Sequence, residues 1–239
     1  MSIQTRTIEY FDNDILLEGF LAYDEAMPQP LPAVLVSHAW GGRDEFACEK
    51  ARKLAEMGYA GFALDMYGRG MLGSGPEENA RLMQPFMDDR RLLQGRMTSA
   101  LKAVRGLKEV DGDRIAAIGF CFGGLCVLDL ARTGADIRGV VSFHGLLIPP
   151  GNTRGNPIKA KVLVLHGHDD PMAPPEQVLA LEKELTESGA DWQVHVYGGT
   201  VHAFTNPRAN DPSFGTVYKA SADRRSWQNL QNFLAEVLH

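Results

Sequence analysis

The sequence has few cysteines, no cluster of basic residues and no long apolar run. Its 239 residues include 3 cysteines, a small and odd number that does not suit a disulfide framework. A chain of this length also buries a core large enough to need no such cross-links. The three thiols are therefore expected to be reduced, as in a cytoplasmic protein, which leaves one of them available for chemistry.

Charge and hydropathy argue against two kinds of partner. Lys and Arg number 24 and Asp and Glu 30, so the net charge is −6 at pH 7, which suits neither nucleic acid nor an anionic membrane. No apolar run has the length of a transmembrane helix, and residues 1–10 lack the apolar region of a secretory signal. We expect a cytoplasmic monomer or homodimer that acts on a small molecule, with no nucleic acid and no membrane as partner.

Short apolar segments alternate with helical ones along the chain. Strands are predicted at 8–10, 16–23, 33–38, 59–65, 114–120, 139–143, 162–166 and 194–197, and helices at 46–57, 88–110, 123–132, 175–188 and 217–238. This alternation predicts an α/β fold with a mostly parallel twisted sheet and helices on both faces. Without a linker or repeat, residues 1–239 are expected to form a single domain. The Gly- and Pro-rich stretches 68–76 and 148–157 are either walls of a ligand crevice or plain surface turns.

One cysteine stands between a predicted strand and the helix that follows it. The segment Gly119-Phe120-Cys121-Phe122-Gly123 has the G-x-nucleophile-x-G pattern of a nucleophile elbow, with cysteine where serine is more usual. Such a turn exposes the nucleophile at a helix N-terminus, which favours a thiolate, and aims the N–H of Phe122 at a developing oxyanion. The alternative is a buried cysteine in a glycine-rich turn, and a packing role is our interpretation of Cys48 and Cys126.

An acid and a histidine follow later in the chain. Asp170 comes shortly after the strand at 162–166, and His202 follows the strand at 194–197. Cys121, Asp170 and His202 stand in the order nucleophile, acid, base that accompanies such an elbow, and together they predict a catalytic triad. His166-x-His168-x-Asp170 also resembles the start of a metallo-β-lactamase-type metal motif, but Pro171 stands where that motif has its next histidine, so we expect no metal.

These residues resemble the dienelactone hydrolase family of α/β-hydrolases. The matching segments are GFCFGG at 119–124, GHDD at 167–170, VHAF at 201–204 and LDMYG at 64–68, and the similarity runs from about Ile8 to Leu238. The resemblance implies an α/β-hydrolase fold without a separate cap domain and a triad of Cys121, His202 and Asp170. It also implies an oxyanion hole formed by the N–H groups of Phe122 and Ala39, no cofactor, and hydrolysis of a carboxylic ester or lactone through an acyl-enzyme.

Two positions depart from the family pattern. Dienelactone hydrolases carry a glutamate where this chain has His38, and an arginine that clamps the substrate carboxylate where it has Asn206; Arg81 is only a loose match to a second clamp arginine. We therefore expect a less charged ester or lactone as substrate. The candidate pocket residues are His38, Trp40, Met83, Phe86, His144 and Phe204, of which Met83 and Phe86 also suit the core face of a helix.

Two other functions stay open on the sequence. A thiolate beside a histidine and an oxyanion hole would also attack phosphorus in a phosphotriester, as a promiscuous activity. The chain would alternatively be a non-catalytic binding module that kept the fold, although the full set of Cys121, Asp170 and His202 argues against this.

Overall fold

Strands and helices alternate along residues 1–239, all of which the computed structural model describes. In chain order they are β1 (Ile3–Asp12), β2 (Ile15–Asp24), β3 (Leu31–Ser37), α1 (Glu45–Glu56), β4 (Ala60–Ala63), α2 (Pro76–Asp88), α3 (Arg90–Arg105), β5 (Val110–Phe120), α4 (Phe122–Arg132), β6 (Gly139–Phe143), β7 (Lys161–Gly167), α5 (Pro175–Glu187), β8 (Trp192–Tyr197), β9 (Asn210–Asp211), β10 (Thr216–Val217) and α6 (Ala220–Leu238). The predicted α/β class with mostly parallel strands is confirmed. The chain divides into two units, Met1–Ile118 and Gly119–His239, and the single domain stays a prediction.

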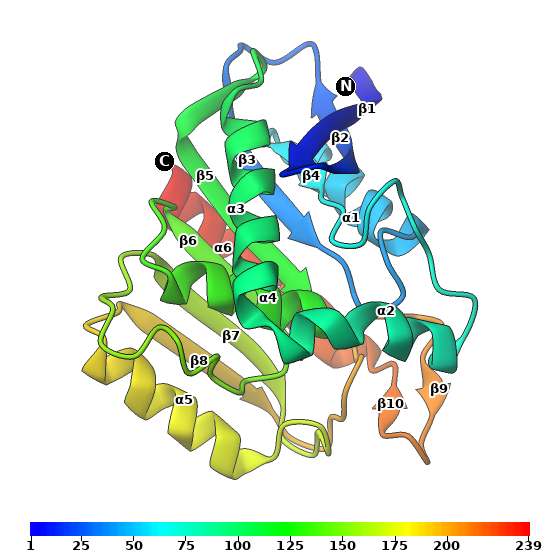
Figure 1. The fold of residues 1–239 in the computed structure, drawn as a ribbon, viewed down its shortest axis with the longest axis vertical. Helices are drawn as coiled ribbons and strands as arrows, with labels where there is room; N and C mark the ends of the chain where they lie inside the picture. The colour runs from blue at the N-terminus through cyan, green and yellow to red at the C-terminus, as the bar shows by residue number, and fades with distance from the viewer. The chain divides into compact units, whose positions relative to one another are not determined.

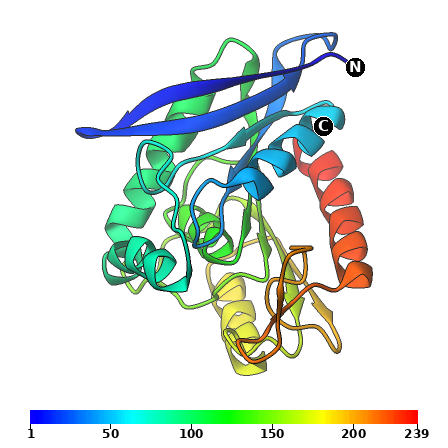
Figure 2. The same ribbon diagram turned by 90° about the vertical axis from the view of Figure 1, so that its right-hand side faces the viewer.

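The unit Met1–Ile118 contains a sheet in which β1, β2, β4, β3 and β5 are neighbours in that order. β1 and β2 form a long antiparallel hairpin, and β3 pairs in parallel with β4. α1 packs on β4 and β2, while α3 contacts β1 and β3. The two helices lie on opposite faces of these strands (Figures 1 and 2), so this part of the sheet is covered on both sides.

The ends of α1 follow from its sequence. The Asp44 side chain accepts a hydrogen bond from the N–H of Ala47, and Glu45 adds a negative charge to the first turn. Both features stabilise a helix N-terminus, where backbone N–H groups lack partners. Gly58 follows the last turn with φ +89°, a left-handed conformation that glycine adopts readily and that ends helices.

The unit Gly119–His239 contains β6, β7 and β8 as parallel neighbours. β6 is buried along its whole length and β7 nearly so, as expected for strands that are covered on both faces. α4 packs on β6, and α6 contacts β6 and β7. Figures 1 and 2 show α4 and α5 on one face of these strands and α6 on the other.

Two parts of the chain differ from the sequence prediction. The helix predicted at 88–110 ends at Arg105, and a separate helix, α2, precedes it. Asp89 divides the two because its backbone is extended (φ −121°, ψ 95°) and its side chain caps α3 by accepting from the N–H groups of Arg91 and Leu92. The hairpin of β9 and β10 was not predicted, since two-residue strands leave no hydrophobic period to detect.

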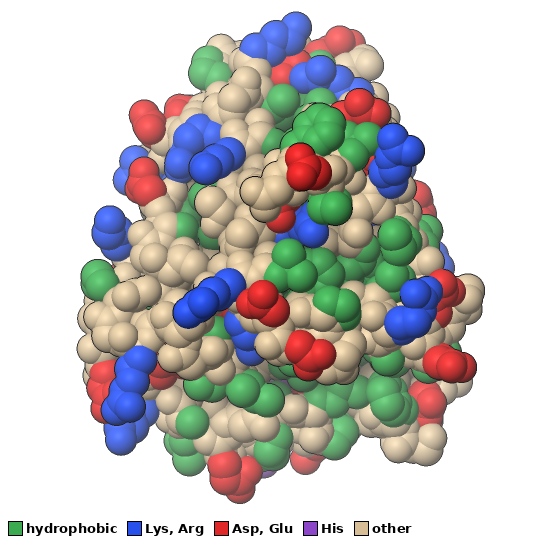
Figure 3. All heavy atoms as spheres, in the orientation of Figure 1, with side chains coloured by type: hydrophobic (Ala, Val, Ile, Leu, Met, Phe, Trp, Pro, Cys, Tyr) green, Lys and Arg blue, Asp and Glu red, His purple; other side chains and the backbone are tan.

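Acidic and basic side chains intermingle on the face of the molecule that Figure 3 shows. None of the helices combines the length and the apolar character that crossing a bilayer requires.

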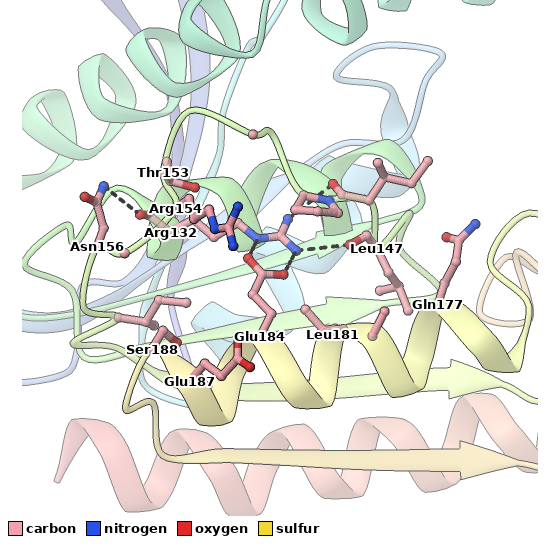
Figure 4. A pocket seen from close by; sticks show the side chains of 16 residues that line it. Arg132, Leu147, Thr153, Arg154, Asn156, Gln177, Leu181, Glu184, Glu187 and Ser188 are labelled. Carbon is pink, nitrogen blue, oxygen red and sulfur yellow. Dashed lines mark hydrogen bonds and ion pairs between the residues drawn. The ribbon is translucent and has the colours of Figure 1, made fainter.

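Arg132, the last residue of α4, has the largest side chain that is completely buried. Its guanidinium lies 3.1 Å from Asp129 and binds both carboxylate oxygens of Glu184 at 2.8 Å. It also donates to the carbonyls of Leu147 at 3.0 Å and Ile148 at 3.4 Å, as Figure 4 shows in part. One side chain thus joins α4, α5 and the segment after β6.

Replacing Arg132 with alanine should lower the free energy of unfolding by about 3–5 kcal/mol, because Asp129 is left as a buried charge without its cation. Urea unfolding followed by circular dichroism measures this loss. Arg114→Ala is the matched control, since Arg114 pairs with Asp111 while partly exposed and should cost less than about 1 kcal/mol. Equal losses in both variants would contradict a special role for Arg132.

Candidate active site

Cys121 lies in the sharp turn between β5 and α4. Its backbone has φ 56° and ψ −117°, a strained conformation for a residue with a side chain, and its N–H donates to the carbonyl of Phe143 at 3.1 Å. A Cβ added to Gly119 would lie 2.0 Å from the carbonyl oxygen of Gly123, and one on Gly124 would lie 2.7 Å from the Cα of Gly145. The helix therefore leaves the strand through a turn that only glycine allows, and the predicted strand–turn–helix context is present.

The three thiols differ in their exposure. Cys121 is half-buried, whereas Cys48 and Cys126 are buried in helices α1 and α4. Burial raises the pKa of the Cys48 thiol, which lies 3.6 Å from a guanidinium nitrogen of Arg43. Cys48 and Cys126 thus have the packing environment expected from the sequence.

Asp170 and His202 lie together in the interior. The Nδ1 atom of His202 is 2.7 Å from Oδ2 of Asp170, and both side chains are about fully buried. Asp170 follows β7, with its N–H bonded to the carbonyl of Gly167, and its Oδ1 accepts from the N–H of Met172 at 2.9 Å. The loop therefore holds one carboxylate oxygen and leaves the other for the imidazole, which orients the ring.

Cys121 acts electrostatically on the same imidazole. Burial by itself lowers the pKa of His202, but attraction and hydrogen bonding to Cys121 and Asp170 outweigh burial and raise that pKa to about 10. The structure therefore brings Cys121, His202 and Asp170 together in one unit. A protonated imidazole between a sulfur and a carboxylate is the arrangement that favours a thiolate.

Two further predicted residues, His144 and Phe204, pack beside His202. The ring of His144 meets the rings of His202 and Phe204 edge to face, with centroids 5.1 Å and 5.0 Å away. Nε2 of His144 is 2.8 Å from the hydroxyl of Thr205. Thr205 was missed in the sequence, where its place one residue after Phe204 was the only signal.

The side chains of the H-x-H-x-D segment point to different partners. Nε2 of His166 is 2.8 Å from the carbonyl of Ala173, His168 is exposed, and Asp170 binds His202. Burial lowers the pKa of His166. No group of three or more His, Cys, Asp or Glu side chains is arranged to hold a metal ion.

The other predicted pocket residues belong to the unit Met1–Ile118, where Tyr67 joins three of them. The ring of Tyr67 packs against His38 at 4.9 Å and Phe86 at 5.7 Å, and its hydroxyl donates to the carbonyl of Trp40 at 2.8 Å. Sequence reasoning noted Tyr67 only as part of the LDMYG match. Its contacts place it at the centre of this cluster.

His38 is a neutral histidine in this cluster. Burial lowers its pKa, its Nε2 accepts from the N–H of Met66 at 3.2 Å, and its Nδ1 is 2.6 Å from the carbonyl of Ala39. These bonds assign the proton to Nδ1. Where the family pattern has a negative glutamate, this chain therefore has an uncharged ring.

Two residues considered as contacts for a substrate carboxylate, Arg81 and Asn206, have other partners. Arg81 is exposed and pairs with Glu78 at 3.0 Å, and the side-chain oxygen of Asn206 accepts from the N–H of Arg208 in a local turn. Met83, unlike the buried Phe86, is half-buried on α2. The expectation that Met83 and Phe86 line a pocket stays a prediction.

Comparison with known proteins identifies the family. The sequence profile of the dienelactone hydrolase family matches residues 17–238. The chain belongs to the dienelactone hydrolase family. Members of this family hydrolyse esters or lactones, and this chain is such a hydrolase.

Solved structures of other dienelactone hydrolase relatives have the same fold. A dienelactone hydrolase-like promiscuous phosphotriesterase from metagenomic libraries is 37% identical, with a TM-score of 0.94 and 100% of both chains covered. A protein called m3DLH is 36% identical, with a TM-score of 0.95 and the same coverage. Among curated relatives, a "Probable 2-oxo-3-(5-oxofuran-2-ylidene)propanoate lactonase" of Bradyrhizobium is 27% identical over 98% of this chain and 96% of its own. The predicted α/β-hydrolase fold is thereby confirmed.

Proposed function

We propose that this dienelactone hydrolase family member cleaves carboxylic esters or lactones of low charge through a triad of Cys121, His202 and Asp170. The observation that carries the proposal is the buried 2.7 Å contact between His202 and Asp170, together with a pKa of His202 that Cys121 helps to raise to about 10. A nucleophile, a base and a group that orients the base are the parts that acyl transfer needs.

In the first half-reaction the thiolate of Cys121 attacks the carbonyl carbon of the substrate. The carbonyl π electrons move to oxygen and form a tetrahedral oxyanion. As the oxyanion collapses, the C–O bond to the leaving group breaks, and protonated His202 delivers its Nε2 proton to the departing alkoxide. The products of this step are an alcohol, a neutral imidazole and a thioester on Cys121.

In the second half-reaction water attacks the thioester. Neutral His202 takes a proton from the water, and the resulting tetrahedral intermediate expels the sulfur of Cys121. The product leaves as a carboxylic acid, which then loses its proton to bulk water, and His202 keeps the proton that it took from water beside the regenerated thiolate. Asp170 holds Nδ1–H throughout, which stabilises each imidazolium that forms.

The oxyanion is proposed to be held by two backbone N–H groups. Phe122 is the first residue of α4, where N–H groups lack helical partners. Ala39 follows β3 and is assigned by the family pattern. In comparable sites, each such donor stabilises the transition state by about 3–4 kcal/mol.

We infer a substrate of low charge from the residues at the positions where the family pattern binds the carboxylate of an acidic lactone. The side-chain oxygen of Asn206 accepts a hydrogen bond within a local turn, Arg81 is paired with Glu78, and His38 is neutral. None of these three supplies an unpaired positive charge to a substrate carboxylate. A neutral acyl group is therefore the better match.

Phosphotriesters are a second candidate substrate class. The support is the 37% identical relative over the whole chain, which is a promiscuous phosphotriesterase. In this reaction the sulfur of Cys121 attacks phosphorus and displaces the aryloxide, which leaves a phosphorylated cysteine for water to hydrolyse. The oxyanion hole would then hold the phosphoryl oxygen.

A matched substrate pair tests the proposed specificity. We expect p-nitrophenyl butyrate to be hydrolysed with a kcat/KM at least about tenfold above that of the p-nitrophenyl monoester of glutaric acid, whose free carboxylate lacks a cation, since tenfold corresponds to about 1.4 kcal/mol. Asn206→Arg should narrow that ratio. A preference of the unaltered protein for the acidic ester would contradict the proposal.

A further arm of the same assay uses paraoxon. An initial burst of p-nitrophenolate and a diethylphosphoryl mass increase on the Cys121 peptide would support the second activity. Absence of the adduct would contradict attack by Cys121 on phosphorus. If no ester, lactone or phosphotriester is hydrolysed, the proposed function itself is wrong.

A further inference from the structure

A cavity of about 760 Å³ lies between α5 and the segment Leu147–Ile158. Its volume falls in the range of small-molecule sites. The apolar part of the wall consists of Leu147, Ile148, Pro149, Ile158, Ala180 and Leu181. Figure 4 shows Leu181, Glu184 and Gln177 on the side of α5 that faces Leu147, Thr153 and Arg154.

The charged groups of this wall are mostly neutralised by one another. The guanidinium of Arg132 binds Asp129, Glu184 and two backbone carbonyls. Glu187, which is largely exposed, lies 3.8 Å from Lys183. These groups therefore leave little charge for a ligand.

One charged group of the wall remains available. Arg154 is exposed and makes no hydrogen bond or ion pair with the rest of the chain. A cation with no counter-charge beside an apolar wall fits an anion with an apolar body, and guanidinium recognises carboxylates well.

The cavity wall at Arg132 lies away from Cys121. α4 starts immediately after Cys121 and ends at Arg132, so the 11 residues of the helix separate the nucleophile from the cavity wall at Arg132 by about 16 Å. Part of the cavity wall is formed by the Pro- and Gly-rich stretch 148–157. The sequence had left open whether this stretch is a wall of a ligand crevice or a plain surface turn.

We propose that this cavity is a second binding site, which takes a monocarboxylic acid with an apolar chain or ring. Arg154 binds the carboxylate, and the apolar wall on α5 and Leu147–Ile158 covers the hydrocarbon part. Ester hydrolysis releases acids of this chemical class, although binding to the cavity does not require that the proposed catalytic mechanism be right.

Calorimetric titration with octanoate tests the site in the full-length Cys121→Ala protein, which makes the result independent of turnover. We expect saturable binding of one octanoate, and weaker binding of 1-octanol, which has the same chain without the charge. Arg154→Gln should weaken octanoate binding about tenfold or more, because it removes a charge-assisted hydrogen bond. Ala180→Trp, which fills the cavity from an exposed position on α5, should abolish it.

Lys159→Gln is the matched control, since Lys159 is an exposed cation directly after the segment Leu147–Ile158 and does not line the cavity. It should leave octanoate affinity unchanged. Arg154→Gln and Ala180→Trp made in the unaltered protein should keep its ester hydrolysis, which shows that both variants fold. No saturable binding, or equal binding by all variants, would overturn the proposal, and the latter would place octanoate elsewhere on the protein.

Discussion

Replacing Cys121 with alanine should reduce hydrolysis of p-nitrophenyl butyrate by about 10⁶-fold, to the limit of detection. The reason is that the proposed covalent intermediate cannot form without the sulfur, and His202 and Asp170 then have no nucleophile to activate. Residual turnover would come only from the oxyanion hole and from substrate binding. Initial rates with enzyme at micromolar concentration measure the effect.

The matched controls are Cys48→Ala and Cys126→Ala, which remove a buried thiol from α1 and from α4. Both should keep kcat close to that of the unaltered protein, with some loss of stability from the lost packing. Activity retained in Cys121→Ala and lost in Cys126→Ala would transfer the nucleophile to α4 and reject the elbow assignment.

Asp170→Asn should lower kcat by about 10⁴-fold while the protein stays folded. The amide keeps the size of the carboxylate, but it supplies no negative charge to His202 and leaves the ring free to take the wrong tautomer. Steady-state kinetics with p-nitrophenyl butyrate give the loss, and circular dichroism checks the fold.

The same variant should change how Cys121 reacts with iodoacetamide as the pH varies. Folding raises the pKa of His202 from 6.5 to about 10, so the protonated ring stabilises the fold fully below pH 6.5, and this stabilisation is lost as the pH rises toward 10. Within that window the imidazolium supports a thiolate. Asp170→Asn removes one attraction on the proton, so alkylation should become slower near pH 6 and stay unchanged near pH 10, where thiols ionise unaided.

Asp169→Asn is the control for both measurements. Asp169 is exposed and accepts a hydrogen bond from the N–H of Thr200, which the amide oxygen of asparagine also accepts. It should leave kcat and the alkylation profile unchanged. An equal loss in Asp169→Asn and Asp170→Asn would mean that the loop, rather than the charge beside His202, is what catalysis needs.

Local sequence signals predicted the regular elements well and failed where the signal was short or mixed. The strand predicted at 139–143 is β6 itself, because a short, mostly apolar run between turns is typical of a buried strand. The helix predicted at 88–110 overlooked Asp89, which starts a new helix at Arg90. A capping residue within a helical pattern outweighs the periodicity around it.

The sequence by itself determined the order of Cys121, Asp170 and His202 along the chain. It also determined the positions of the glycines around the elbow. They are readable there because the tight turn depends on glycine at neighbouring positions, and because each residue follows a strand. Family membership was readable for the same reason, since the motifs that carry it are local.

Only the tertiary structure decided what those residues touch. His202 meets Asp170 from 32 positions away, His144 meets Thr205 from 61, and Arg132 meets Glu184 from 52. Contacts of this kind determine which nitrogen of His202 faces the carboxylate, which charges are neutralised and which, like Arg154, stay available. They depend on how strands and loops distant in the chain pack together, for which a single sequence carries no local pattern.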